Sequence, residues 1–331
     1  MTDPTTLEQL HNFVDDLGNT LDTVFPGDIR CGNIILCGMG GSAITADVVA
    51  DCCSPSSVKP ITVVKSPVLP SWVGGETLAI VSSYSGNTAE TIEMYRCACD
   101  AGCTVVAITS GGVLGQLAES DGRPIMVLPK GLHPRHSIGY MIGYTLAVMR
   151  AAGCPDVSDE VRRVLPELRA YRDSLEGEGS MAVELASLYM GHVPVVCSDS
   201  GLKSVVLRWK TQFNENSKYV AFCSPIPEFN HCGLGSWLDD HRDNYALTVL
   251  VTGVDRASGP VADAMSRLDS AGVPYRRIDM DGSSPMADML MAVMLGDYTS
   301  VRMAEMRGID PAEVKPVMLM KERLSRRHPV G

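Results

Sequence analysis

Two short segments of the sequence combine glycines with hydroxyl side chains, a composition suited to holding an anion. The first, CGMGGS at residues 37–42, has glycines that let the backbone approach a ligand closely and ends in a serine whose hydroxyl can donate. The second, SSYSGNT at residues 82–88, places several hydroxyls around one turn, a shell suited to an exchangeable phosphate. The candidate hydroxyl donors are Ser42 in the first segment and Ser83, Ser85 and Thr88 in the second.

Two other interpretations of these segments stay open from the residues alone. The tetrapeptide SGNT at residues 85–88 is also an ordinary turn and helix cap. The pair Gly38 and Gly40 also suggests a dinucleotide fingerprint, but that motif requires a third small residue in the helix and an acidic residue about 20 positions further on. The next predicted strand ends at Lys65 instead, and nothing further along the chain indicates hydride transfer. We therefore favour a phosphate site over a dinucleotide site.

Short apolar segments alternate with longer amphipathic ones from Asn33 onward, which predicts parallel strands joined by crossover helices. The predicted strands of the first half are residues 33–37, 62–64, 78–82, 105–108 and 124–128. The predicted helices between them are residues 43–51, 88–101 and 138–151. Both candidate phosphate turns follow a predicted strand and open a predicted helix, where backbone N–H groups and the positive helix end attract an anion.

The alternation resumes after a helical segment at residues 157–189, which the sequence EGEG at 176–179 interrupts as a linker region. The predicted strands of this second block are residues 193–197, 245–251 and 275–278. Its predicted helices are residues 205–216, 260–271, 286–307 and a C-terminal helix at 316–326. The predicted fold class is α/β: two three-layer αβα domains with parallel, doubly wound, flavodoxin-like sheets, at residues 1–155 and 156–331. The repeat is structural, because the halves share no convincing residue identity.

Composition excludes several classes of partner. Of the 331 residues 45% are hydrophobic, and the net charge of -11 disfavours binding to nucleic acid or to an anionic membrane surface. The apolar stretches are shorter than the roughly 20 residues that cross a bilayer, and the N-terminal residues have neither the basic start nor the apolar run of a signal peptide. The 11 cysteines are scattered without the spacing of a zinc site, so we expect reduced thiols in a cytoplasmic protein and no metal.

Four further segments carry a resemblance to a known family. They are LPKG through PR at residues 128–135, NENSK at 214–218, PEFNH at 227–231, and a final helix that includes Lys321. With the two turns, they make the chain similar to the bifunctional phosphoglucose/phosphomannose isomerase family of the sugar isomerase (SIS) domain superfamily, over roughly residues 30–325.

This resemblance implies a homodimer of two SIS-type domains per chain, with no cofactor and an active site between the subunits. The implied reaction interconverts glucose 6-phosphate, and mannose 6-phosphate, with fructose 6-phosphate in glycolysis. Glu215 would move a proton between C1 and C2 through a cis-enediol, and Arg135 would stabilise the enediolate. His231, donated by the neighbouring subunit, and Lys321 would open the sugar ring. The substrate phosphate would bind at Gly41, Ser42, Ser83, Ser85 and Thr88.

One departure from the family pattern keeps alternatives open. The family continues with Asn-Glu where this chain has Cys232 and Gly233 after His231, a change that would loosen the histidine or fit another substrate. The alternatives are an isomerase of another phosphosugar, such as an amino sugar phosphate, and a non-catalytic phosphosugar sensor. Sensors of this superfamily normally carry a DNA-binding helix-turn-helix, whereas residues 6–25 offer one short acidic helical pattern. His133 and His136 flank Arg135, and the sequence assigns them no role.

Overall fold

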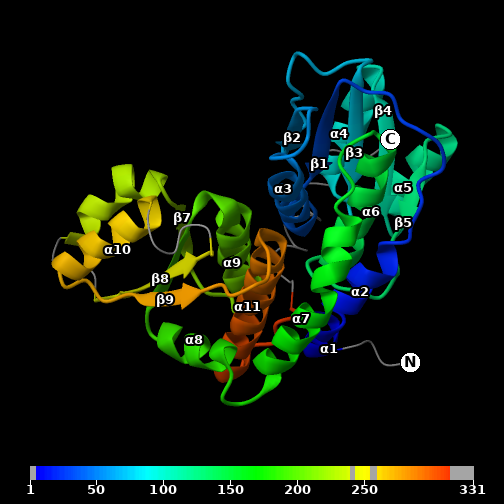
Figure 1. Cartoon of the computed structure of the whole chain (residues 1–331). Helices are drawn as coiled ribbons and strands as arrows, with labels where there is room; N and C mark the ends of the chain where they lie inside the picture. The colour runs from blue at the N-terminus through cyan, green and yellow to red at the C-terminus, as the bar shows by residue number, and fades with distance from the viewer. Residues whose placement is uncertain (1–4, 239–242, 254–258, 314–331) are drawn as a thin grey trace. The chain divides into compact units, whose positions relative to one another are not determined.

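The computed structural model describes residues 5–238, 243–253 and 259–313, and these form two compact units (Figure 1). The first unit lies within Met1–Arg162 and the second is Arg163–Glu313. The two units divide inside helix α7 (Ser158–Glu176), whereas the EGEG break lies further along, between α7 and α8 (Met181–Tyr189). The predicted C-terminal helix and Lys321 lie outside the described residues.

The first unit is a three-layer αβα structure around a parallel sheet with the order β2-β1-β3-β4-β5. The strands are β1 (Asn33–Gly38), β2 (Ile61–Val64), β3 (Thr77–Ser82), β4 (Thr104–Thr109) and β5 (Ile125–Val127). The helices are α1 (Thr6–His11), α2 (Phe13–Thr20), α3 (Gly40–Cys53), α4 (Ala89–Asp100), α5 (Gly112–Ser120) and α6 (Ile138–Ala151). Helices α4 and α5 pack on one face of the sheet, where residues such as Ile35 and Val81 are buried, and α3 and α6 pack together on the other.

Within its described residues, the second unit repeats this strand order with four strands. Its parallel sheet has the order β7-β6-β8-β9, formed by β6 (Val193–Ser198), β7 (Phe222–Pro225), β8 (Tyr245–Val251) and β9 (Arg276–Asp279). Its helices are α8, α9 (Lys203–Glu215), α10 (Pro260–Ser270) and α11 (Pro285–Met306), with short turns η1 (Ser200–Leu202), η2 (Phe229–Gly233) and η3 (Leu234–Leu238). Helix α10 packs with η2 and η3 against one face, and α11 packs against α8 and α9.

The prediction of an α/β fold with parallel sheets is confirmed, because every described strand pair is parallel. Central strand β3 is buried at every position, which explains its continuous apolar run at residues 78–81. The prediction from the sequence did not include β7 and α5. The single helical pattern predicted at residues 6–25 is two helices, α1 and α2.

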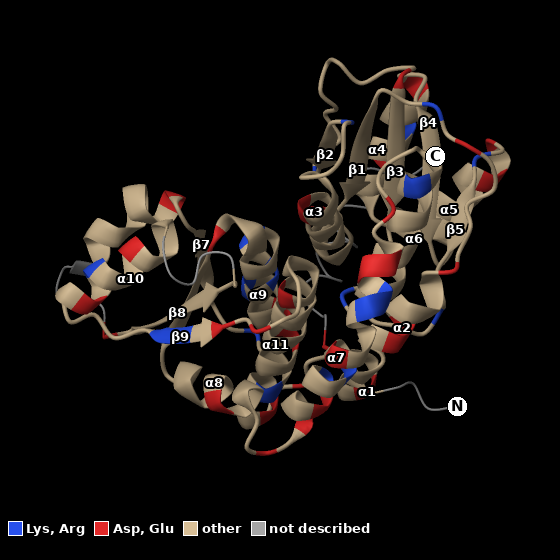
Figure 2. Ribbon diagram, viewed as in Figure 1, with Lys and Arg blue, Asp and Glu red and all other residues tan. Residues whose placement is uncertain are grey.

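The charged side chains are interspersed in both signs along the helices (Figure 2). On α10, for example, Arg267 pairs with Asp263 one turn away. None of the helices in the described ranges combines the length and the apolar character that a membrane crossing needs.

Both the backbone conformation and the neighbouring atoms require a glycine at Gly86, in the serine-rich turn. Its φ is +66°, and a Cβ built there would lie 1.8 Å from the carbonyl oxygen of Gly111. We expect Gly86→Ala to lower the free energy of unfolding by about 3 kcal/mol, because left-handed strain and overpacking combine. Denaturant unfolding measures the loss.

Gly122→Ala is the matched control, because Gly122 has φ +63° and nothing lies within 4 Å of the built Cβ. This variant should therefore lose only about 1 kcal/mol. Equal losses would contradict the packing argument.

Asp16, on α2, is a buried carboxyl whose titration affects stability. Burial raises its pKa from 3.8 to about 6, although a hydrogen bond from Tyr140 acts in the opposite direction. Between about pH 4 and pH 6 the unfolded chain releases a proton that the folded unit keeps, so stability decreases as pH rises through this window and stays lower above it.

Asp16→Asn should therefore match the wild type near pH 4 and gain on the order of 1 kcal/mol above about pH 6, after allowance for solvent screening. Thermal unfolding across this range measures the difference. Asp22→Asn, at a largely exposed side chain, is the control that should show no such pH-dependent gain. A gain for Asp16→Asn that does not change with pH would show that the carboxyl does not titrate as argued.

Candidate functional site

The two predicted phosphate turns lie next to each other at the carboxyl edge of the first sheet. Strands β1 and β3 are neighbours, and Gly38 is the register partner of Ser82, so both turns leave the sheet at the same level. Arg135, which follows β5, reaches this edge as well: a Cβ built on Gly41 would lie 3.1 Å from the Cα of Arg135. Ligands usually bind outside the carboxyl ends of such strands, where the strand order reverses. The first unit therefore gathers the predicted phosphate ligands and Arg135 in one place.

The serine-rich turn is ordered by its own hydroxyls. Ser83 is buried, and its Oγ donates to Oγ1 of Thr88 over 3.3 Å. The Oγ of Ser85 accepts from the backbone N–H of Asn87 over 3.3 Å, and Thr88 precedes α4 in an extended conformation. In the first turn of α3, Ser42 is also buried. These side chains are fixed before a ligand binds, which reduces the entropy lost on binding.

Tyr84 holds the loop that carries Arg135, a role that the sequence did not indicate. Its hydroxyl donates to the carbonyl of Pro129 over 2.9 Å and accepts from the N–H of Leu132 over 2.7 Å. Burial raises the pKa of Tyr84, so the hydroxyl keeps its proton at neutral pH. Arg135 itself is 3% exposed. The loop that leads to Arg135 is thus held by a tyrosine from within the predicted phosphate turn.

Glu215, the predicted base, is the last residue of α9 and is half-buried. Hydrogen bonds between α9 and α11 fix this end of the helix. Within the helix, Arg208 makes a buried two-pronged ion pair with Asp297, at 2.9 and 2.7 Å. Immediately after Glu215, the Nδ2 of Asn216 donates to the Oγ of Ser300 over 2.9 Å. The backbone that carries the Glu215 carboxylate is therefore rigidly placed in the second unit.

Glu215 and His231 lie at opposite edges of the second sheet. Helix α9 leaves the carboxyl end of β6 and returns the chain to the start of the parallel strand β7, so Glu215 lies at the amino edge. His231 follows β7 and so lies at the carboxyl edge. The 13 residues of α9 span about 20 Å. Within one chain the structure does not bring these two predicted residues together.

His231 is exposed in η2, in a loop with its own contacts. The preceding Asn230 donates from Nδ2 to the carbonyl of Pro260 over 2.8 Å. The thiol of Cys232 donates to the Oε1 of Glu228 over 3.2 Å, and this carboxylate raises the pKa of the thiol. The segment that departs from the family pattern is thus a folded turn, in which the residues on both sides of His231 make hydrogen bonds.

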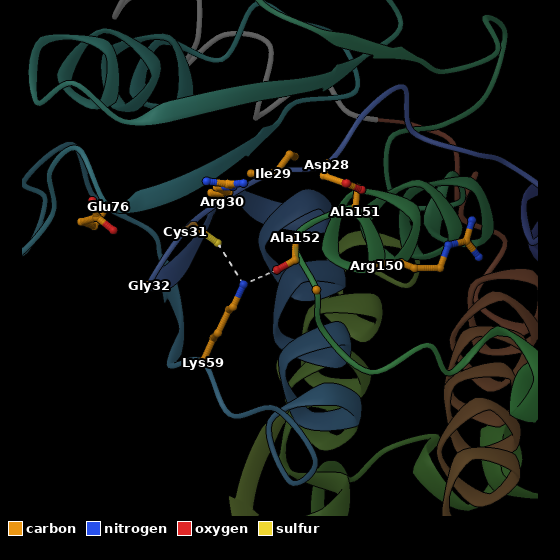
Figure 3. Close-up of a pocket in the computed structure, with 11 residues that line it drawn as sticks. Asp28, Ile29, Arg30, Cys31, Gly32, Lys59, Glu76, Arg150, Ala151 and Ala152 are labelled. Carbon is orange, nitrogen blue, oxygen red and sulfur yellow. Dashed lines mark hydrogen bonds between the residues drawn. The ribbon is translucent and has the colours of Figure 1, made fainter.

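A separate cavity of about 450 Å³ lies at the amino end of the first sheet (Figure 3). The residues that line it lie just before β1, β2 and β3 along the chain and at the end of α6. Lys59 donates to the carbonyl oxygen of Ala152, and its Nζ lies 3.8 Å from the Sγ of Cys31. None of the predicted site residues that the structure describes lines it. Nowhere in the described residues do three His, Cys, Asp or Glu side chains gather as metal ligands.

The fold is similar to that of solved structures of phosphosugar enzymes. Tagatose-6-phosphate ketose/aldose isomerase from Escherichia coli superposes with a TM-score of 0.72, covering 93% of this chain and 95% of that one at 20% identity. Residues 178–324 match the family described as the C-terminal SIS domain of bacterial phospho-glucose isomerase. The fold and this match define the class: an α/β protein of the SIS type.

Relatives in sequence narrow the class to one family. A bifunctional phosphoglucose/phosphomannose isomerase from Aquifex aeolicus is 33% identical over 297 residues, which cover 88% of this chain and 90% of the relative. One from Thermoplasma volcanium is 34% identical over 294 residues, which cover 88% and 91%. The chain belongs to the bifunctional phosphoglucose/phosphomannose isomerase family.

Proposed function

We propose that the protein is an aldose–ketose isomerase that interconverts glucose 6-phosphate and mannose 6-phosphate with fructose 6-phosphate. The observation that carries the proposal is the carboxyl edge of the first sheet, where two hydroxyl-rich and glycine-rich turns meet Arg135. Family membership supports the choice of hexose 6-phosphates, because the relatives carry the names of these two isomerase activities.

In this proposal the first unit holds the substrate. The phosphate binds to Gly41 and Ser42 of one turn and to Ser83, Ser85 and Thr88 of the other. Arg135 stabilises the negative charge that develops on the enediolate, a task suited to a planar guanidinium held in place by its loop. Because these groups are ordered before binding, they lose little entropy when substrate arrives.

The second unit supplies the proton transfer. The carboxylate of Glu215 removes the proton from C2 of the aldose and returns it to C1. Through the cis-enediol the proton of the C2 hydroxyl passes to O1, so atoms and charge balance. His231 and Lys321 move the protons that open the ring, at the ring oxygen and at the C1 hydroxyl.

His231 acts in the site of a neighbouring subunit in this proposal. The placement of Glu215 and His231 at opposite edges of one sheet supports it, because a hexose phosphate is far shorter than the roughly 20 Å length of α9. A homodimer with two equivalent sites follows, in which each subunit lends its histidine to the other.

The test is turnover of glucose 6-phosphate and of mannose 6-phosphate to fructose 6-phosphate, each with and without chelator. We expect turnover of both substrates and no effect of the chelator. Glucosamine 6-phosphate tests the alternative specificity that the loop after His231 leaves open. Binding of both hexose phosphates without turnover would indicate a sensor, and turnover of glucosamine 6-phosphate alone would indicate an amino sugar isomerase.

A further inference from the structure

Asp199 occupies, in the second unit, the place that corresponds to the phosphate turns of the first. The strand orders β2-β1-β3-β4 and β7-β6-β8-β9 are the same, so β6 corresponds to β1 and β8 to β3. The turns after β1 and β3 are the predicted phosphate turns. Their counterparts after β6 and β8 begin with Asp199 and Thr252.

The carboxylate of Asp199 connects these two counterpart turns. Its Oδ1 accepts from the N–H of Gly201 over 2.8 Å, within its own turn. Its Oδ2 accepts from the Oγ1 of Thr252 over 2.6 Å and from the N–H of Thr252 over 3.3 Å, across the sheet edge. Asp199 is 5% exposed. Backbone amides and a hydroxyl from two turns are the donor set that a tetrahedral oxyanion would use.

A second buried carboxylate binds the next amide of the same turn. The Oδ2 of Asp288, in the first turn of α11, accepts from the N–H of Gly253 over 3.3 Å, and its Oδ1 accepts from the N–H of Gly282 over 2.8 Å. Two consecutive amides after β8, those of Thr252 and Gly253, therefore both donate to carboxylates of the chain itself.

The first unit differs at the corresponding place. Within the described part of the chain, no carboxylate accepts a hydrogen bond from residues 39–42 or 83–88. The hydroxyls there bond to each other or to backbone. The turns of the first sheet thus have donors available to an external anion, whereas carboxylates of the chain itself accept from the corresponding turns of the second sheet.

We infer that Asp199 is the internal ligand of a latent oxyanion site, so that each chain binds one phosphate group, at the first unit, and the second unit cannot take another. The inference rests on the proposed function in one respect only, namely that the single phosphate bound by the wild-type chain lies at the first unit. Removing the Asp199 carboxylate should leave its three donors facing a gap that inorganic phosphate can fill.

The experiment compares inorganic phosphate binding to the wild type, Asp199→Ala and Asp199→Asn by equilibrium dialysis. Asp199→Asn removes the charge but fills the space, so it is the matched control. We expect one phosphate per chain for the wild type and for Asp199→Asn, and two for Asp199→Ala. One phosphate for Asp199→Ala, or two for the wild type, would overturn the inference.

Thermal unfolding gives a second readout that does not depend on the first-unit site. Phosphate at about a hundredfold above its Kd should raise the Tm of Asp199→Ala by about 5 °C more than that of the wild type, relative to chloride at matched ionic strength. If Asp199→Ala does not fold in chloride, its refolding yield should recover in phosphate. No recovery would contradict the latent site. Turnover plays no part in these measurements, so a failed substrate proposal would leave them interpretable.

Discussion

Glu215→Gln is expected to bind fructose 6-phosphate with nearly unchanged affinity and to lose turnover by at least about a hundredfold. Gln keeps the size and polarity of the side chain but cannot accept the proton from carbon, and positioned acid–base groups contribute roughly 10²- to 10⁴-fold. The helix end is held by bonds that do not involve the carboxylate, such as Asn216 to Ser300, so the variant should fold normally. Loss of kcat with little change in KM is the measurable signature.

The control for this experiment is Glu184→Gln, which removes a carboxylate from an exposed position of the same unit. Glu184 forms a surface pair with Arg276, so its loss should change neither activity nor folding appreciably. Retained turnover in Glu215→Gln would contradict the assignment of the base. A loss of both binding and stability would instead mean that the carboxylate has a structural role.

The regular elements of the fold were predictable because their sequences carry a strong local signal. The buried strand β3 has an unbroken apolar run at residues 78–81, and α6 begins and ends at the predicted residues, 138 and 151. Strand β7 escaped prediction because FCSP is short, half-exposed and ends in proline. Its place at the edge of the sheet, beside β6, explains how a proline is tolerated there.

Site residues could be proposed from the sequence only where a motif is local. The predicted phosphate turns combine sequence-adjacent residues, so their types alone led to the prediction of an anion site. Tyr84 lies within one of those turns, but its partners Pro129 and Leu132 come from a distant segment, and no local pattern shows that the hydroxyl holds the Arg135 loop. The same holds for Asp199 and Thr252, whose contact depends on β6 and β8 being neighbours. Contacts that the topology creates carry no signal in either segment alone.

Mixed dimers of Glu215→Gln and His231→Ala chains should recover activity that neither variant has alone. If His231 serves the neighbouring site, a dimer with one chain of each kind contains one site with both an intact glutamate and an intact histidine. The other site lacks both. Each mixed dimer should therefore have about half the activity of the wild-type dimer.

Co-expression with two different affinity tags isolates the mixed dimers, and each variant purified alone is the control for residual activity. The two arrangements give opposite results, because a site that takes both residues from one chain is incomplete in every mixed dimer. Inactive mixed dimers would thus contradict the donation of His231 to the neighbouring site. Recovery to about half would be difficult to explain by any arrangement other than a shared site, since neither chain carries both residues intact.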